Sequence, residues 1–120
     1  MSTESDTPKK LSLVVFSGTY EKVHYALVMA SAALASGRDV TLFFTMDASR
    51  ALFAPSGWRH LRTEVDGATA TSIDLSYSTR GIGTFEELLS ACASLNAKFM
   101  VCEMGLRALG LENEAKRDDL

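Results

Sequence analysis

The chain has 120 residues, of which 47% are hydrophobic and 22% charged, and its formal net charge at pH 7 is -3. This length and balance are typical of one globular domain, and the acidic charge excludes the basic footprint of a nucleic-acid-binding protein. The two cysteines do not make a disulfide framework, and no Cys/His cluster has the spacing of a zinc site. We therefore expect a reduced, cytoplasmic protein that holds no metal.

The first ten residues differ in character from those that follow. Residues 1–10 are polar and mixed in charge, and they lack the apolar core of a signal peptide. No stretch of the chain is apolar for long enough to cross a bilayer. These features predict a flexible tail over residues 1–10, a single domain over residues 11–120, and no membrane span.

The first half of the chain has the pattern of a strand, a helix and a second strand. Residues 11–16 form an almost continuous apolar run, as in a strand that is covered on both faces. Apolar residues recur at helical spacing over residues 20–36, Thr19 is a candidate N-cap, and Gly37 supplies the stop. Residues 39–45 are rich in β-branched and aromatic residues, which predicts the second strand.

The second half is less regular. Asp47 is a candidate cap for a short helix through Phe53, and β-branched residues over 69–75 indicate a strand, with residues 76–83 as an alternative mobile loop. Thr84 and Glu87 have the spacing of a capping box, which predicts a helix that ends at Asn96. An apolar strand over residues 97–102 and a short helix over 103–110 complete the chain. This order predicts an α/β fold in which a mostly parallel sheet of 4–5 strands lies between helical layers.

Cys102 is the first candidate for chemistry. It ends the last predicted strand and precedes a helix, where open α/β sheets place their ligands and where helix-end N–H groups favour a thiolate. The alternative is an inert thiol, because free cysteine often packs as a small hydrophobe. Cys92 lies on the apolar stripe of its predicted helix, where we expect it to pack, unless it approaches Cys102 and acts as a resolving thiol.

Two further segments are candidate anion sites. Ser17, Gly18 and Thr19 join the first strand to the first helix and open on the same sheet edge as Cys102, but they lack both the GxGxxG and the Walker A spacing. We therefore favour a structural turn and expect no bound flavin or nucleotide. Arg80, which two nearby glycines follow, is either a solvated cation or part of an anion-holding rim.

The remaining aromatic and histidine residues have two interpretations. Trp58 and Phe53 flank a Pro-Ser-Gly turn, where they either form a subunit interface or cover the core of the domain. For His24 and His60 we expect surface or interface packing rather than catalysis, because neither has a readable partner.

Three segments together resemble the DsrE/DsrF-like proteins, the sulfur-relay family that includes the TusD-like subunits. They are residues 14–18 with the helix that ends at 30–37, residues 40–45, and residues 85–89 leading to 97–104. The last is the most specific, because Cys102 is followed two residues later by Met104, and residues 109–111 continue the family pattern. The resemblance covers about residues 11–111.

The resemblance implies a flavodoxin-like, three-layer α/β/α domain that assembles into homo-oligomers, trimers or hexamers. It implies that Cys102 carries sulfane sulfur as a persulfide between sulfur-donor and sulfur-acceptor proteins, with no organic cofactor. Two alternatives remain: a thiol peroxidase, with Cys92 or another subunit supplying the resolving thiol, and a non-enzymatic oligomeric binding protein with an inert Cys102. The pocket candidates beside Cys102 are Ser17, Gly18, Thr19, Met104, Gly105 and Arg80.

Overall fold

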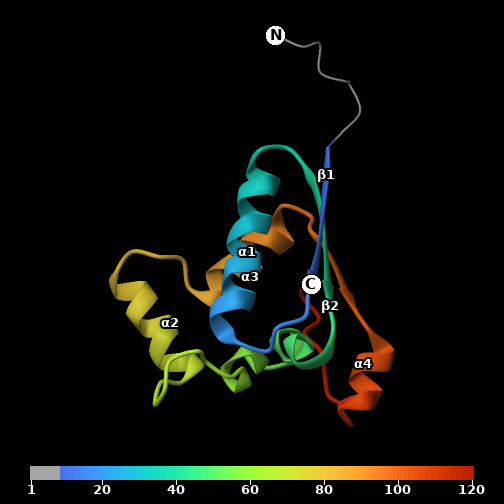
Figure 1. Cartoon of the computed structure of the whole chain (residues 1–120). Coiled ribbons are helices and arrows are strands. Elements are labelled where there is room, and N and C mark those ends of the chain that lie inside the picture. The colour runs from blue at the N-terminus through green and yellow to red at the C-terminus, as the bar shows by residue number, and fades with distance from the viewer. Residues whose placement is uncertain (1–8) are drawn as a thin grey trace.

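One parallel sheet organises the molecule in the computed structural model, which describes residues 9–120 (Figure 1). Its three strands are β1 (Lys10–Val15), β2 (Asp39–Phe44) and β3 (Lys98–Val101), in the spatial order β1-β2-β3. Both strand pairs are parallel, and the register places Val14 beside Phe43 and Phe43 beside Met100. All three strands therefore end at the same edge of the sheet.

The helices lie in the connections between strands and after the last one. Helix α1 (Tyr20–Ala35) joins β1 to β2, which confirms the predicted strand–helix–strand unit. The long connection from β2 to β3 holds two 3-10 helices, η1 (Met46–Leu52) and η2 (Gly57–His60), and two α-helices, α2 (Ala70–Thr79) and α3 (Phe85–Ser94). Helix α4 (Glu103–Ala108) follows β3.

The predicted strand over residues 69–75 is wrong, because this segment lies in α2, so the sheet has three strands and not 4–5. Thr69 and Ser72 form a capping box: the Thr69 side chain accepts from the Ser72 amide at 3.1 Å, and the Ser72 hydroxyl oxygen accepts from the Thr69 amide at 3.0 Å. Ile73 and Tyr77, one helical turn apart, pack against the core. The local cap and this spacing outweigh the β propensity of the threonines and Ile73.

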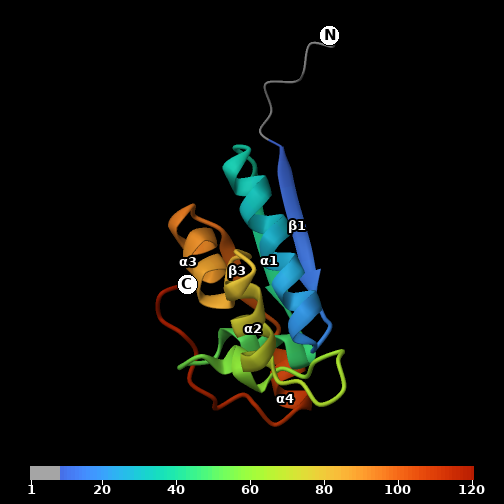
Figure 2. The same ribbon diagram turned by 90° about the vertical axis from the view of Figure 1, so that its left-hand side faces the viewer.

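Figure 1 shows α4 on the other side of the sheet from α1, while one face of the sheet is covered by α1 and α3. Helices α1 and α3 pack together on that face, as both views show (Figures 1 and 2). The shared face of α1 and α3 follows from the strand order, which runs from β1 to β3 without reversing. Crossovers of the same hand that step in the same direction place their helices on the same face, whereas a doubly wound fold needs a reversal. The other face leaves Val14 71% and Met100 43% exposed.

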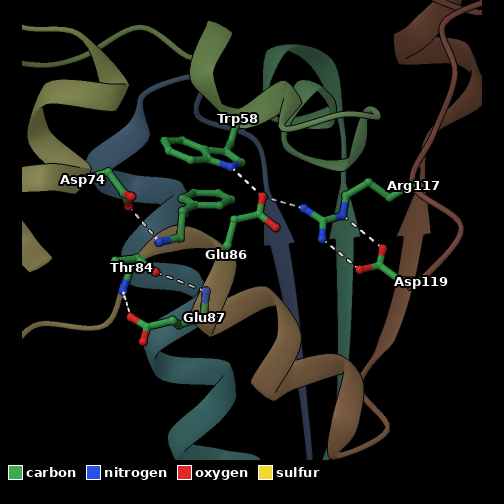
Figure 3. Close-up of polar contacts among 8 residues, drawn as sticks. Trp58, Asp74, Thr84, Glu86, Glu87, Arg117 and Asp119 are labelled. Carbon is green, nitrogen blue, oxygen red and sulfur yellow. Dashed lines mark hydrogen bonds and ion pairs between the residues drawn. The ribbon is translucent and has the colours of Figure 1, made fainter.

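Helix ends follow the predicted signals at some positions and not at others. The capping box at Thr84 is confirmed: its side-chain oxygen accepts from the Glu87 amide at 3.3 Å, and the Glu87 carboxylate accepts from the Thr84 amide at 2.8 Å (Figure 3). Asn96 has a φ of 68°, which ends the α3 segment as expected. Asp47 is not a cap, because η1 begins at Met46 after Thr45 and Asp47 lies inside it. The Asp47 carboxylate accepts instead from Arg50.

An aromatic cluster fills the core beneath the helices. Trp58 and Phe53 are 2% and 7% exposed, so their assignment to a subunit interface is wrong and their assignment to the core is confirmed. His24 is also buried rather than at the surface, and its Nε2 atom is 2.8 Å from the Gly83 carbonyl oxygen. Tyr20 packs among these rings in tilted contacts and donates its hydroxyl proton to Asp74 at 2.5 Å.

The C-terminal segment is fastened to α3 by a charged cluster that the sequence did not suggest (Figure 3). The Glu86 Oε2 atom accepts from the Trp58 indole nitrogen and from Arg117 Nη1, both at 2.7 Å. Arg117 also donates to both carboxylate oxygens of Asp119 at 3.0 and 2.8 Å. Its backbone amide donates to the Leu52 carbonyl at 2.8 Å. The end of the chain is thus held against η1 and α3.

The predicted flexible tail, residues 1–10, lies outside the described residues up to position 8, whereas Lys10 already belongs to β1. Across the part of the chain that is described, no helix combines the length and the apolar character that a membrane crossing requires.

Candidate functional site

Cys102 lies where the sequence placed it, at the carboxyl end of β3. Its backbone amide donates to the Phe44 carbonyl at 2.9 Å, which extends the pairing of β3 with β2 by one step. Cys102 is then the N-cap residue of α4, with extended backbone angles. The thiol is therefore held between a sheet edge and the first turn of a helix.

Three donors surround the Cys102 sulfur. The Gly105 amide donates to Sγ at 3.4 Å. Hydrogen bonds from the Gly105 amide and the Thr45 hydroxyl lower the pKa of Cys102 below its usual value and outweigh burial, which raises it, and the Met104 amide adds a still smaller lowering effect. Donors that point at the sulfur stabilise its negative charge more than the neutral thiol, so this position favours a thiolate.

Gly105 lets the first turn of α4 approach the end of β2. A Cβ at position 105 would lie 3.0 Å from the Met46 backbone nitrogen and 3.0 Å from Thr45 Oγ1. This close approach brings the Thr45 hydroxyl to the thiol. Thr45 is a site residue that the sequence analysis missed, although its position directly after β2 places it beside the end of β3.

Cys92 has a different environment. It is fully buried on α3, which confirms the predicted packing role, and its thiol donates to the Leu27 carbonyl of α1 at 3.8 Å. Burial raises the pKa of Cys92 to about 11. Cys92 contacts the helical layer while Cys102 contacts α4 and Thr45, and both thiols are free. The structure does not bring the two sulfurs together.

The other predicted pocket residues are spread over the molecule. Met104 is 79% exposed and adjoins Cys102 in the first turn of α4. The loop from Ser17 to Thr19 lies on the same sheet edge as Cys102, separated from it by β2, and its Thr19 hydroxyl donates to Glu64 at 2.7 Å. Arg80 caps the end of α2, which Figure 1 shows on the opposite side of the molecule from α4.

Two cavities adjoin this edge of the sheet. One of about 480 Å³ lies beside α4, where Val101 and Glu103, on either side of Cys102 in sequence, form part of its wall. The other, of about 180 Å³, lies beside Gly18 and includes His60. Between residues 9 and 120, no group of three or more His, Cys, Asp or Glu side chains is arranged to hold a metal ion.

A model of the DsrE/DsrF-like family matches residues 9–119 of this chain. No match to a curated protein was found. The family match extends from the start of β1 past α4, so it includes the whole sheet and Cys102. It confirms the resemblance found in the sequence, and the chain belongs to the DsrE/DsrF-like family.

Proposed function

We propose that this protein is a sulfur-relay component that carries sulfane sulfur as a persulfide on Cys102. The observation that carries the proposal is the set of donors at the sulfur, with the Gly105 amide 3.4 Å from Sγ and the Thr45 hydroxyl beside it. Membership of the DsrE/DsrF-like family supports the same assignment. A reducing compartment such as the cytoplasm suits this role, because a free thiol persists there.

The proposed reaction is two successive exchanges at sulfur. The Cys102 thiolate attacks the terminal sulfur of a donor persulfide, a new S–S bond forms at Sγ, and the donor leaves as a thiolate with the electron pair of the broken S–S bond. An acceptor thiolate then attacks the terminal sulfur, and Cys102 leaves as a thiolate. No net oxidation occurs in either exchange, and no outside oxidant is needed.

The donors at Cys102 serve both exchanges. They raise the thiolate fraction that attacks the donor, and they stabilise the same thiolate when it is the leaving group, since thiols of lower pKa leave faster. Cys92 lacks both advantages, because it is fully buried and its pKa is raised to about 11. Sulfur loading is therefore expected at Cys102 alone.

Intact-mass measurement after incubation with a low-molecular-weight persulfide donor tests the proposal. The wild type and Cys92→Ala should each gain the mass of one sulfur atom, and the gain should disappear on reduction. Cys102→Ser keeps the shape of the side chain but loses the nucleophile, so it should gain nothing. Sulfur uptake by Cys102→Ser, or a Cys102 that resists alkylation in the folded protein, would exclude the relay and favour a binding protein with an inert thiol.

The same variants distinguish a peroxidase. A peroxidase requires Cys102 to be oxidised by peroxide and then resolved by a second thiol. Cys92 is buried against α1, so resolution would have to come from another subunit. Rapid peroxide turnover by Cys92→Ala with no stable persulfide would replace the relay with peroxidase activity.

We also propose that the chain forms a homo-oligomer through the uncovered sheet face. Because Trp58 and Phe53 lie in the core, they do not supply a subunit interface. The exposed apolar side chains of Val14, Phe16 and Met100 are available for one instead. Contiguous apolar residues on a sheet face mark an interaction site. Light scattering at micromolar concentration should detect a trimer, a hexamer or another closed assembly, and a monomer would contradict it.

A further inference from the structure

A small polar cavity lies at the carboxyl edge of the sheet, where the loop after β1 meets η1 and η2. It has a volume of about 180 Å³ and is lined by Gly18, Asp47, Arg50, His60 and Arg62. Two guanidinium groups and an imidazole thus share the cavity with one carboxylate, in a chain whose net charge is -3. We infer that this cavity binds a small tetrahedral oxyanion, a phosphate or sulfate group that is either free or the terminal group of a small molecule.

Arg62 is held in place by its backbone and has a free side chain. Residues Thr19 and Arg62 form a parallel bridge, in which the Tyr20 amide donates to the Arg62 carbonyl at 2.7 Å and the Arg62 amide donates to the Gly18 carbonyl at 3.1 Å. Within residues 9–120 its guanidinium makes no hydrogen bond or ion pair. The donors of Arg62 are therefore available to a ligand, and the bridge fixes the position of its backbone at the cavity wall.

Gly18 leaves the floor of the cavity without a side chain. A Cβ at this position would lie 2.5 Å from the Asp47 Cβ atom and 3.3 Å from Arg62 Nη2. The guanidinium consequently lies against bare backbone, close to the segment from η1 that carries Asp47 and Arg50. Position 18 cannot carry a side chain without displacing these groups, so the glycine keeps the cavity open.

The charge balance of the cavity remains positive. Arg50 Nε donates to Asp47 Oδ1 at 3.3 Å, which orients the guanidinium and leaves its other N–H groups free. The nearby acid Glu64 accepts from the Thr19 hydroxyl at 2.7 Å and lies 3.8 Å from Lys22 Nζ. Asp47 is thus the one acid in the lining, opposed by two permanent cations.

Size and donor geometry define the ligand class. Pockets for drug-sized molecules measure about 300 to 1,000 Å³, so a cavity of about 180 Å³ fits a single oxyanion with water rather than a nucleotide. Planar guanidinium groups match the paired oxygens of phosphate and sulfate. Cys102 is not part of this lining, so the inference is independent of sulfur transfer.

The test is a titration of the folded protein with inorganic phosphate, sulfate and glycerol phosphate at constant ionic strength, with chloride as the control anion. Calorimetry gives the affinity, and the amide resonance of Gly18 locates the site. Arg62→Gln should weaken binding by about tenfold or more, the usual weight of a hydrogen bond to a charged group. Arg59→Gln is the matched control, because it also removes one positive charge, from the neighbouring η2. The Arg59 guanidinium lies 5.4 Å from the Trp58 ring centroid and is not part of the cavity lining.

Asp47→Asn should change the anion affinity in the opposite direction to Arg62→Gln. It removes the one repelling carboxylate and releases Arg50, so phosphate and sulfate should bind more tightly than to the wild type. If glycerol phosphate binds more tightly than phosphate, the ligand is the terminal group of an ester. If the two bind equally, the ligand is a free oxyanion. The inference is overturned if Arg62→Gln and Arg59→Gln weaken binding equally, if Asp47→Asn weakens it, or if no anion shifts the Gly18 resonance. Cys102→Ser should bind the anion normally, which separates this outcome from that of the sulfur-relay test.

Discussion

Replacing Glu86 by leucine tests the cluster that fastens the C-terminal segment. The Glu86 carboxylate accepts from the Trp58 indole and from Arg117, each at 2.7 Å. Leucine leaves the indole N–H of a side chain that is 2% exposed without a partner, which costs about 1 to 3 kcal/mol. The ion pair adds about 1 kcal/mol at most, because the Glu86 side chain is 43% exposed. We therefore expect Glu86→Leu to lower the free energy of unfolding by about 2 kcal/mol.

Glutamine at the same position separates the two contributions. Its amide oxygen still accepts from Trp58 while the charge opposite Arg117 is lost, so Glu86→Gln should cost no more than about 1 kcal/mol. Ser90→Leu, at an exposed position of the same helix, should change stability by less than about 0.5 kcal/mol. Urea unfolding followed by circular dichroism and by fluorescence of Trp58, the single tryptophan, gives all three values. A cost for Glu86→Leu below about 0.5 kcal/mol, or equal costs for leucine and glutamine, would refute the reasoning.

The pH dependence gives a second measurement on the same residue. Burial disfavours the Glu86 charge, but the hydrogen bonds from Arg117 and Trp58 outweigh burial and hold the pKa of Glu86 below its ordinary value of 4.5. A folded-state pKa below the unfolded one stabilises the protein above the unfolded pKa, and this stabilisation is lost as the pH falls through the folded pKa. The difference in the free energy of unfolding between the wild type and Glu86→Gln should therefore become smaller below pH 4.5. A difference that grows there would contradict a lowered pKa for Glu86.

Three further changes test the site and the helix ends. Thr45→Val removes a hydroxyl that lowers the pKa of Cys102, so the midpoint of the alkylation rate against pH should move upward, and an unmoved midpoint would mean that Thr45 does not contact the thiolate. Thr84→Ala removes the capping box of α3 and should cost about 1 kcal/mol in urea unfolding, whereas Thr84→Ser should restore most of it. Burial and Asp74 raise the pKa of Tyr20, so absorbance titration should show that one of the three tyrosines ionises only on alkaline unfolding, and stability from this group should be lost as the pH rises above about 10. Ionisation of all three tyrosines in the folded protein would contradict that environment.

Local signals predicted the part of the fold around Cys102 correctly. The capping box at Thr84, the apolar stripe of α3 and the left-handed Asn96 are each encoded within a few residues, and together they fix where β3 begins. The segment at 69–75 carries a conflict, since threonine is favoured both in strands and at helix N-caps. Contact of Ile73 and Tyr77 with the core decides in favour of the helix, and that contact is not visible in the local sequence.

The layers and the polar cavity depend on information that a sequence pattern does not contain. The same alternation of strands and helices places the crossover helices on one face of the sheet or on both, according to whether the spatial order of the strands reverses, and between β1 and β3 it does not. Likewise, Arg62 reaches the loop after β1 through a bridge with Thr19, which pairs residues far apart in the chain. The arginines at positions 50 and 62 share one cavity, although no local sequence pattern connects them.

The two cysteines show why a position on an element decides the chemistry of a side chain. Inside a helix the backbone N–H groups bond to carbonyls one turn earlier, so the interior position of Cys92 offers no amide to a sulfur anion. At the start of a helix the first N–H groups have no such partner, and Cys102 as N-cap receives the Gly105 amide while β2 adds the Thr45 hydroxyl. The N-cap alone does not select a thiol, because serine or asparagine caps as well or better. The proposed sulfur transfer gives a reason for cysteine at this N-cap, because in that proposal the donors serve the anion rather than the stability of the six-residue helix α4.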